Sequence, residues 1–228
     1  MSLHNALVDE AEKSMKSTLM LVIEFALLLA GIAIYALGVF PFPILPLFLV
    51  AWASLHLRHM RWRDVGLKRP ERWLRILGLA LLIGVAYQGL DIFLIAPLLQ
   101  GLTGEVIDLS QFDFLRGNLL ALLAFLAASW TVAAFIEEMF FRGYLLNRFM
   151  DVTNKERLGV ALGLVGNALV FGAAHAYQGI TGVVDTLLAG LVLSTLYLLT
   201  RRNLWLPILT HGVIDTVGFL LIYAGLFG

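Results

Sequence analysis

Two adjacent carboxylates and an arginine lie inside an apolar stretch of the sequence, in the segment Phe135-Ile-Glu-Glu-Met-Phe-Phe-Arg142. In an α-helix, residues four apart share a face, so Glu138 and Arg142 can form an ion pair, whereas Glu137 points about 100° away. The charges of this pair neutralise each other, which leaves the carboxylate of Glu137 without a charged partner. A surplus carboxylate in an apolar setting is suited to take a proton from water and return it. The alternative is an arginine-bridged pair of carboxylates that only joins two helices.

Two histidines and an aspartate follow in later apolar stretches. His211 and Asp215 repeat the four-residue spacing, so the carboxylate can hold one imidazole nitrogen and fix the tautomer of the other. His175 follows the run Phe171-Gly-Ala-Ala, whose small side chains would let another helix or a substrate backbone approach. A lone histidine inside a membrane more often bridges helices. Two histidines, a surplus glutamate and an orienting aspartate together favour a catalytic site.

The composition places these residues in a membrane protein. Of the 228 residues, 60% are hydrophobic and 14% are charged, whereas soluble domains are about half apolar and about 25% charged. Sixteen basic and sixteen acidic residues give zero formal net charge, so nothing favours a nucleic-acid partner. The lipid bilayer is the expected partner. Because the chain has no cysteine, a metal site would have to use histidines and carboxylates.

Seven apolar stretches are long enough to cross a bilayer, which requires about 20 residues. We expect an all-α, polytopic transmembrane helix bundle of about seven spans (six to eight). It would form one membrane-embedded domain over residues 1–228, with the polar motifs in a core at about 119–228. The second stretch is the weakest, since Pro41, Pro43 and Pro46 could break it or make it re-entrant. The expected spans are 18–37, 40–57, 73–99, 119–146, 158–176, 183–200 and 204–227.

Positive charges are concentrated in every second connection between these spans. Cations crowd before the first span and in the second, fourth and sixth connections, while the other connections contain only Arg116, beside three acidic residues. The positive-inside rule therefore predicts a multi-pass protein of the cell membrane, with its amino terminus in the cytoplasm and its carboxyl terminus outside. The cations on the cytoplasmic side would be Lys13, Lys16, Arg58, Arg61, Arg63, Lys68, Arg69, Arg72, Arg75, Arg142, Arg148, Lys155, Arg157, Arg201 and Arg202.

Three further ionisable residues lie in or near the expected spans. Glu24 and Asp91 lack an evident local partner, and Asp185 lies near the end of a span. Such residues more often reach the interface or form a helix-packing bond than take part in chemistry. We therefore leave these three out of the candidate site.

The polar motifs, taken in order, resemble those of the CAAX prenyl protease and bacteriocin-processing (CPBP, or Abi) family of intramembrane proteases. Each motif alone is weak, but the ordered set on successive apolar helices is specific. The resemblance covers about the last half of the chain, with weaker echoes in Trp62-Arg-Asp-Val-Gly-Leu67 and Leu204-Trp-Leu-Pro207. The three motifs are Glu137-Glu138-x-x-x-Arg142, Phe171-x-x-x-His175 and His211-x-x-x-Asp215.

The resemblance implies a helical membrane endopeptidase that cuts a membrane-associated protein or peptide. The residue that matches Glu137 would activate water. Family members often carry asparagine at the position of Asp215, and the extra negative charge here leaves the question of a metal open. The residues that would support Glu137 or complete the site are Glu138, Arg142, His175, His211 and Asp215.

The spacing of the motifs is compatible with two cofactor schemes. Two histidines and a glutamate match the ligand set of several zinc hydrolases, so a divalent metal would be held by Glu137, His175 and His211. A metal-free site would use Glu137 as the base and the imidazoles as donors to the oxyanion. We favour the metal-free scheme, because a cation bound by Glu137 would leave no clear general base.

The depth of the motifs in the membrane provides a geometric test. At a rise of 1.5 Å per residue, Glu137 lies roughly 16 Å from Arg148. His175 lies roughly 27 Å from Arg157, near the far face of a hydrocarbon core about 30 Å thick. A shared site therefore predicts that the helix before His175 tilts or begins inside the membrane. Its imidazole would then come within about one bridging water of the Glu137 carboxylate.

Two other functions fit the same residue types. A proton- or ion-coupled transporter is the main alternative, because intramembrane chains of Glu, His and Asp also build proton relays. Transporters commonly have two related halves, and the sequence has no second copy of the Glu-Glu-x-x-x-Arg segment. The third possibility is a non-catalytic immunity or scaffold protein on the same fold, against which the intact polar motifs argue.

Overall fold

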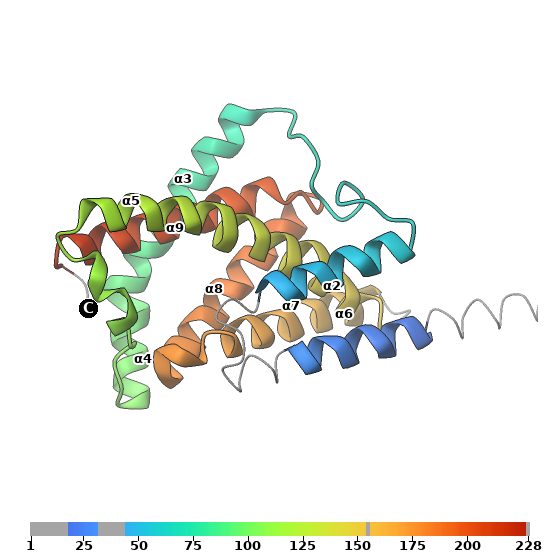
Figure 1. Cartoon of the computed structure of the whole chain (residues 1–228), viewed down its shortest axis with the longest axis horizontal. Helices are drawn as coiled ribbons and strands as arrows, with labels where there is room; N and C mark the ends of the chain where they lie inside the picture. Colours follow the sequence, from blue (N-terminus) through green and yellow to red (C-terminus); the bar gives the residue numbers. More distant parts are fainter. Residues whose placement is uncertain (1–17, 32–43, 154–155, 227–228) are drawn as a thin grey trace, which may run out of the picture. The chain divides into compact units, whose positions relative to one another are not determined.

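The computed structural model describes residues 18–31, 44–153 and 156–226 (Figure 1). These residues form helices and connecting turns, without a strand among them. In this part of the chain, five helices are long and apolar enough to cross a membrane, and two shorter apolar helices precede them. The predicted all-α bundle of about seven apolar helices is therefore confirmed.

The chain divides into two compact units, Met1–His59 and Met60–Gly228. The described part of the first unit contains an apolar helix, Thr18–Gly31, and α2 (Ile44–Leu57). Pro46 lies in the first turn of α2, where a backbone N–H would have no partner within the helix, so it does not interrupt α2. The predicted span ends at 32–37 and 40–43, with Pro41 and Pro43, lie outside the described residues, as do Lys13, Lys16 and Lys155.

The second unit begins with the long helix Trp73–Thr103. Its middle contains a π-helical turn that ends two residues before a proline, Pro97. Proline has no N–H to donate to the carbonyl one turn earlier, so the helix widens before it and continues beyond it. In chain order the segments are α3 (Trp73–Leu90), the π-helical turn Asp91–Ile95 and α4 (Ala96–Thr103).

The next long helix, Leu119–Met150, carries the two glutamates and the arginine. The side chain of Asn118 caps its start, accepting a hydrogen bond from the Ala121 N–H at 3.1 Å. Most of its middle is π-helical, a geometry that is rare and often occurs at functional sites. The segments are α5 (Leu119–Ala128), the π-helical stretches Ser129–Glu137 and Met139–Leu145, and α6 (Leu146–Met150).

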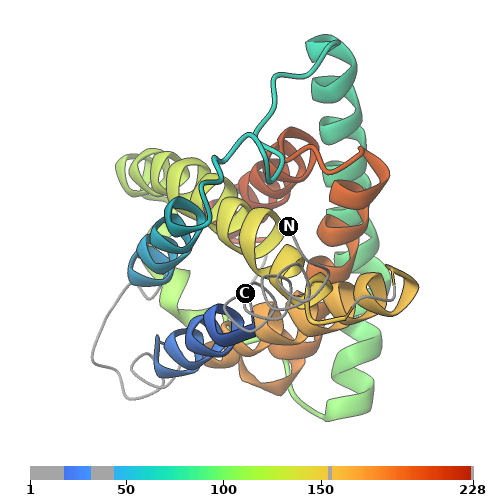
Figure 2. The same ribbon diagram turned by 90° about the vertical axis from the view of Figure 1, so that its right-hand side faces the viewer.

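Three more helices complete the described part of this unit: α7 (Glu156–Ala173), α8 (Gly179–Leu199) and α9 (Trp205–Tyr223). Figures 1 and 2 show α7 beside α8, and α9 between α3 and the long helix that begins with α5. The three polar motifs thus come from three helices that pack together. The observed helix ends differ from the predicted span ends by a few residues.

Glycines allow α7 to pack antiparallel against the end of the preceding long helix. A Cβ at Gly159 would lie 2.7 Å from the Met150 carbonyl oxygen, and one at Gly163 would lie 3.1 Å from the Leu146 carbonyl oxygen. The two backbones therefore approach more closely than a larger residue would permit. The small-residue spacing in the sequence indicated this close packing.

Candidate active site

Glu138 is the centre of the polar cluster. Its Oε1 accepts one hydrogen bond from Arg142 Nη1 at 2.6 Å and another from His211 Nδ1 at 2.9 Å. The side chains of Glu138 and Arg142 have no exposed surface, and His211 is buried too. The ion pair expected from the four-residue spacing is present, and the same carboxylate also holds α9 against the long helix.

Arg142 connects the long helix to two further helices. Its Nη2 donates a hydrogen bond to the Gly190 carbonyl oxygen on α8 at 3.2 Å. Its guanidinium carbon lies 4.3 Å from the centre of the Phe171 ring on α7 and 5.9 Å from that of Phe141. The electron-rich face of an aromatic ring attracts a cation and partly replaces the hydration that burial removes. Arg142 is therefore fixed by groups from three helices.

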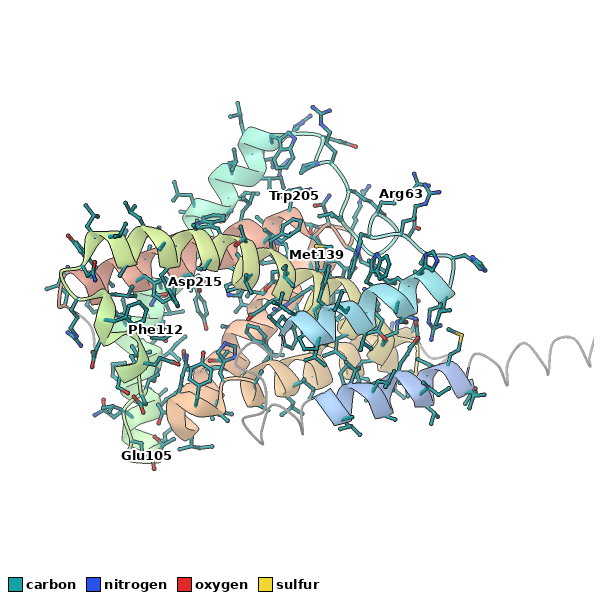
Figure 3. All side chains as sticks on the ribbon, viewed as in Figure 1. Arg63, Glu105, Phe112, Met139, Trp205 and Asp215 are labelled. Atoms are coloured by element: carbon teal, nitrogen blue, oxygen red, sulfur yellow. The ribbon has the colours of Figure 1, made fainter. Side chains whose placement is uncertain are left out.

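Asp215 lies one turn after His211 on α9 (Figure 3). Its Oδ1 is 3.6 Å from His211 Nε2, beyond hydrogen-bond distance. The hydrogen bond that orients His211 comes from Glu138, through Nδ1. Asp215 is an electrostatic neighbour of the imidazole on its other side.

The sequence analysis missed two residues that connect the long helix to α9. Ser129 Oγ donates a hydrogen bond to Asp215 Oδ2 at 2.5 Å, and the next residue, Trp130, donates from Nε1 to Thr216 Oγ1 at 3.1 Å. Ser129 is buried. The partners are 86 positions apart, so no local spacing could have identified them.

Glu137 differs from its neighbour in having no fixed partner. It is half-buried, and its carboxylate forms no hydrogen bond or ion pair with another described residue. Glu138, Arg142, His211 and Asp215 nevertheless lie within electrostatic range of it. A carboxylate in this position is available to a water molecule or a substrate. The two adjacent glutamates therefore occupy different environments.

His175 follows the end of α7 and caps it. Its Nδ1 lies 2.8 Å from the Phe171 carbonyl oxygen, which can only accept, so Nδ1 carries the hydrogen. The neutral ring then presents Nε2 as an acceptor. The Phe171 ring centre lies 5.0 Å from that of His175 and 6.1 Å from that of His211. The structure thus brings both histidines to the same aromatic side chain.

The register of α7 explains how His175 reaches the depth of the glutamates. The rings of Phe141 and Phe171 are 4.8 Å apart. Because α7 runs antiparallel to the long helix, four residues onward from Phe171 correspond to about four residues back from Phe141. This register brings His175 to the level of Glu137. One bridging water between their side chains stays a prediction.

The depths calculated from the sequence for Glu137 and His175 disagree because of the two arginines from which they are measured. The calculation places Arg148 and Arg157 at the same membrane face. Arg148 is only 4% exposed and pairs with Asp151 at 2.9 Å, whereas Arg157 is exposed. Because Gly159 packs against Met150 in this antiparallel pair, Arg157 lies about four residues, or about 6 Å, farther along the helices than Arg148, so the two arginines do not mark the same depth.

The candidate metal ligands are not assembled as a metal site. Among the described residues, no three His, Asp or Glu side chains are placed so that they could hold a metal ion. Glu137, His175 and His211 therefore do not form such a set, and the Nδ1 of His211 is already bonded to Glu138.

The three ionisable residues that were left out of the site have packing partners. Both oxygens of Glu24 accept hydrogen bonds from Arg58 at 2.9 Å, and Ser54 donates a further one. The carboxyl groups of Asp91 and Asp185 lie close to each other, at a contact between the π-helical turn of the first long helix and α8. The described structure thus gives all three a role in helix packing.

Residues 119–217 match a protein-family model described as Type II CAAX prenyl endopeptidase Rce1-like. The matched segment begins with the second long helix and ends in α9, two residues after Asp215, so it contains all six candidate residues. No curated protein and no solved structure shows significant similarity to the chain.

Proposed function

Because residues 119–217 match the family model of type II CAAX prenyl endopeptidases of the Rce1-like kind, we propose that Glu137 activates the attacking water in an intramembrane cleavage reaction. The match and the apolar helices together support a multi-pass membrane peptidase of the CAAX type. Its substrate is a membrane-associated protein or peptide. The proposal concerns which residues act and how.

The different surroundings of the two adjacent glutamates carry the proposal. Glu138 is fully buried and bound by Arg142 and His211, so its charge is committed to holding the site together. Glu137 is half-buried and has no hydrogen bond or ion pair to another described residue. Of the two carboxylates, Glu137 is the one that is free to exchange a proton with water.

The proposed reaction balances its protons through Glu137. The carboxylate takes a proton from water as the water oxygen forms a bond to the carbonyl carbon of the scissile peptide. Glu137 then gives this proton to the peptide nitrogen as the carbon–nitrogen bond breaks. The products are a new carboxyl group and a new amine, and Glu137 returns to its starting state.

The cationic and imidazole groups support the negative charge that develops on the carbonyl oxygen. Arg142 is held in place by Glu138, the Gly190 carbonyl and the Phe171 ring, so it provides a fixed positive charge near the reacting atoms. Nδ1 of His211 is bonded to Glu138, and Nε2 lies 3.6 Å from Asp215, beyond hydrogen-bond distance. When His211 carries a hydrogen on each nitrogen, the Nε2–H is the donor left for the substrate, and we assign the stabilisation of the oxyanion to it.

The geometry at His175 limits its role. Since Nδ1 donates to the Phe171 carbonyl, the neutral ring has only Nε2 available, and Nε2 can accept a hydrogen bond but not donate one. We therefore assign His175 to orienting the attacking water, whose second hydrogen would be donated to Nε2. Only the protonated ring could act as a donor to an oxyanion.

The alternating charges lead us to propose a membrane orientation. The exposed cations of residues 60–75 and 201–202 would face the cytoplasm, with the carboxyl terminus outside. Cleavage would then occur inside the membrane toward its cytoplasmic end. The protein would lie in the cell membrane.

A cleavage assay with the full chain in liposomes tests the proposal. The probes are internally quenched peptides that end in Cys-aliphatic-aliphatic-X, in one version farnesylated on the cysteine and in the other unmodified. Mass spectrometry of the products locates the cleaved bond. We expect cleavage next to the cysteine, and solvent labelled with ¹⁸O should place the label in the new carboxyl group.

The two probes also separate the substrate question from the catalytic one. Cleavage of both peptides would mean that the isoprenoid is not required, and cleavage of the farnesylated peptide alone would mean that it is recognised. The Glu137→Gln variant is the control in each case. Undiminished cleavage by the purified variant would refute the assignment of Glu137.

A further inference from the structure

Two connections of the second unit, residues 60–72 and 200–204, join at one end of its helices. The Leu204 N–H donates to the Gly66 carbonyl oxygen at 2.9 Å, and Asn203 Nδ2 donates to the Lys68 carbonyl oxygen at 3.0 Å. Gly66 has φ 115°, and a Cβ there would lie 2.5 Å from the Arg202 carbonyl oxygen. Glycine therefore permits the close approach, and the two connections form one continuous surface.

This surface carries a large excess of positive charge. Residues 60–75 and 200–203 together contain eight cations and two carboxylates, Asp64 and Glu71. Within the described structure, the only ion pair that involves any of these cations is a long one, 3.7 Å, between Arg63 and Asp64. Figure 3 shows Arg63 in the first connection. All eight cations are exposed: Arg61, Arg63, Lys68, Arg69, Arg72, Arg75, Arg201 and Arg202.

The backbone presents two of these cations in an unusual way. Arg201 and Arg202 follow the end of α8 with φ angles of 56° and 58°, in the left-handed region. Non-glycine residues adopt this conformation infrequently, and two in succession need support from the surroundings. The Leu204 and Asn203 hydrogen bonds to the first connection provide it. The fold thus stabilises a strained turn that holds two arginines outward.

Aromatic and apolar side chains place this surface at the edge of the bilayer. The rings of Trp73 and Trp205, at the starts of α3 and α9, pack edge to face with their centres 5.0 Å apart. Tryptophan is enriched where membrane meets water. Leu74, between two of the cations, is 86% exposed, as a side chain in contact with acyl chains would be.

We propose that residues 60–75 and 201–202 bind the headgroups of anionic phospholipids. Arginine and lysine suit phosphate oxygens, and a cluster of several cations beside membrane-spanning helices attracts an anionic leaflet. A soluble phosphate would satisfy the cations but would leave Leu74 exposed to water. A phospholipid satisfies both, since its headgroup meets the cations while its acyl chains cover the leucine.

Lipid retention by the purified full chain tests this proposal. The probes are phosphatidylglycerol and phosphatidylcholine with identical acyl chains, added in detergent and counted by native mass spectrometry. The test variant is Arg69→Gln/Arg72→Gln/Arg75→Gln, matched by a charge-conserving variant with lysine at the same three positions. The second control is Arg116→Gln. Arg116 lies just before the start of the long helix Leu119–Met150, away from the cationic surface. Arg202 of that surface contacts the other end of this helix, through a hydrogen bond to Asn147.

We expect the native chain to retain phosphatidylglycerol in preference to phosphatidylcholine. Each cation near an anionic leaflet changes binding by about fivefold, so the triple glutamine variant should lose about a hundredfold. The triple lysine variant and Arg116→Gln should retain the preference. If the glutamine variant fails to fold, a salt titration of the native chain replaces it, and retention of phosphatidylglycerol alone should fall with ionic strength.

Three outcomes would overturn the proposal. Equal retention of the two lipids by the native chain would remove the anionic specificity. An unchanged preference in the folded glutamine variant would place the lipid elsewhere. Binding of soluble glycerol phosphate as tightly as phosphatidylglycerol at matched concentration would indicate a site for soluble anions.

Discussion

Two polar clusters in apolar helices contain the same residue types, but the carboxylate oxygens are hydrogen-bonded to different extents. In the first unit, Glu24 is saturated: both of its oxygens accept hydrogen bonds from Arg58, and Ser54 donates another. In the second unit, Glu138 receives both of its hydrogen bonds on Oε1, and its Oε2 has no partner among the described residues. Glu137 beside it has no partner there either.

A structural carboxylate can thus be distinguished from a reactive one by whether both of its oxygens have hydrogen-bond donors. A glutamate whose two oxygens both receive donors from a fixed arginine and serine gains little from a water or a substrate, because neither oxygen lacks a hydrogen bond. Where two carboxylates share one arginine, one of them is necessarily left over. The excess acceptor capacity around Glu137 and Glu138 is what makes this cluster a candidate for chemistry.

The sharpest test of this comparison is Glu137→Gln. The amide keeps the shape of the side chain but cannot take a proton from water, so we expect peptidase activity to fall by about 10²–10⁴-fold. Since Glu137 has no fixed partner among the described residues, the melting temperature in detergent should stay close to that of the native chain. A large loss of stability would instead mean that Glu137 is a structural residue.

Glu138→Gln should act mainly on stability. It leaves Arg142, which has no exposed surface, without its charged partner, a change that costs about 3–5 kcal/mol in buried pairs. Thermal unfolding in detergent measures the effect. The double variant Glu138→Gln/Arg142→Met should recover part of the stability, because it leaves neither charge, but not the activity. A Glu138→Gln variant as stable as the native chain would contradict the pairing.

Glu24→Gln provides the matched change in the saturated cluster. The expected loss is smaller, about 1.5–3 kcal/mol, because the Arg58 side chain is 15% exposed and can reach water. Cleavage by the folded fraction should be unchanged, since this cluster has no surplus acceptor. If Glu24→Gln abolished cleavage without unfolding the chain, bond saturation would not distinguish structural from reactive carboxylates.

Ser129→Ala removes the hydrogen bond to Asp215 and should lower kcat by about tenfold, the loss expected for one hydrogen bond to a charged group. Ser129 is a positioning residue, so KM should change little and Ser129→Thr should restore most of the rate. Steady-state kinetics of the three proteins measure this. An equal loss in the threonine variant would point to packing as the cause.

The smallest expected effect is that of metal removal. A metal held by Glu137, His175 and His211 would occupy the free acceptor capacity of Glu137 and make this cluster resemble that of Glu24. We expect instead that dialysis against a chelator leaves the cleavage rate unchanged and that metal analysis finds no stoichiometric zinc. Loss of activity on chelation, with recovery on adding zinc, would assign Glu137 to a metal and not to general-base catalysis.

Local spacing in the sequence was enough to predict the helices and the contacts within them. Apolar runs of sufficient length indicated the spans, and the four-residue spacing of Glu138 and Arg142 predicted their ion pair, because the pitch of one helix fixes both. The same spacing suggested that Asp215 orients His211, but Asp215 lies 3.6 Å from Nε2, and the orienting hydrogen bond joins Nδ1 to Glu138 on another helix. A local rule cannot anticipate a partner from another helix.

Only the tertiary structure decided which groups of different helices meet. The link from Ser129 to Asp215, the approach of both histidines to Phe171 and the depth of His175 depend on the register between α7, α9 and the long helix. Backbone contacts at glycines such as Gly159 fix that register, and the sequence gives no distance between helices. The sequence by itself determined which polar groups lie in the membrane, since their cost there depends only on residue type and span; their pairing depends on packing.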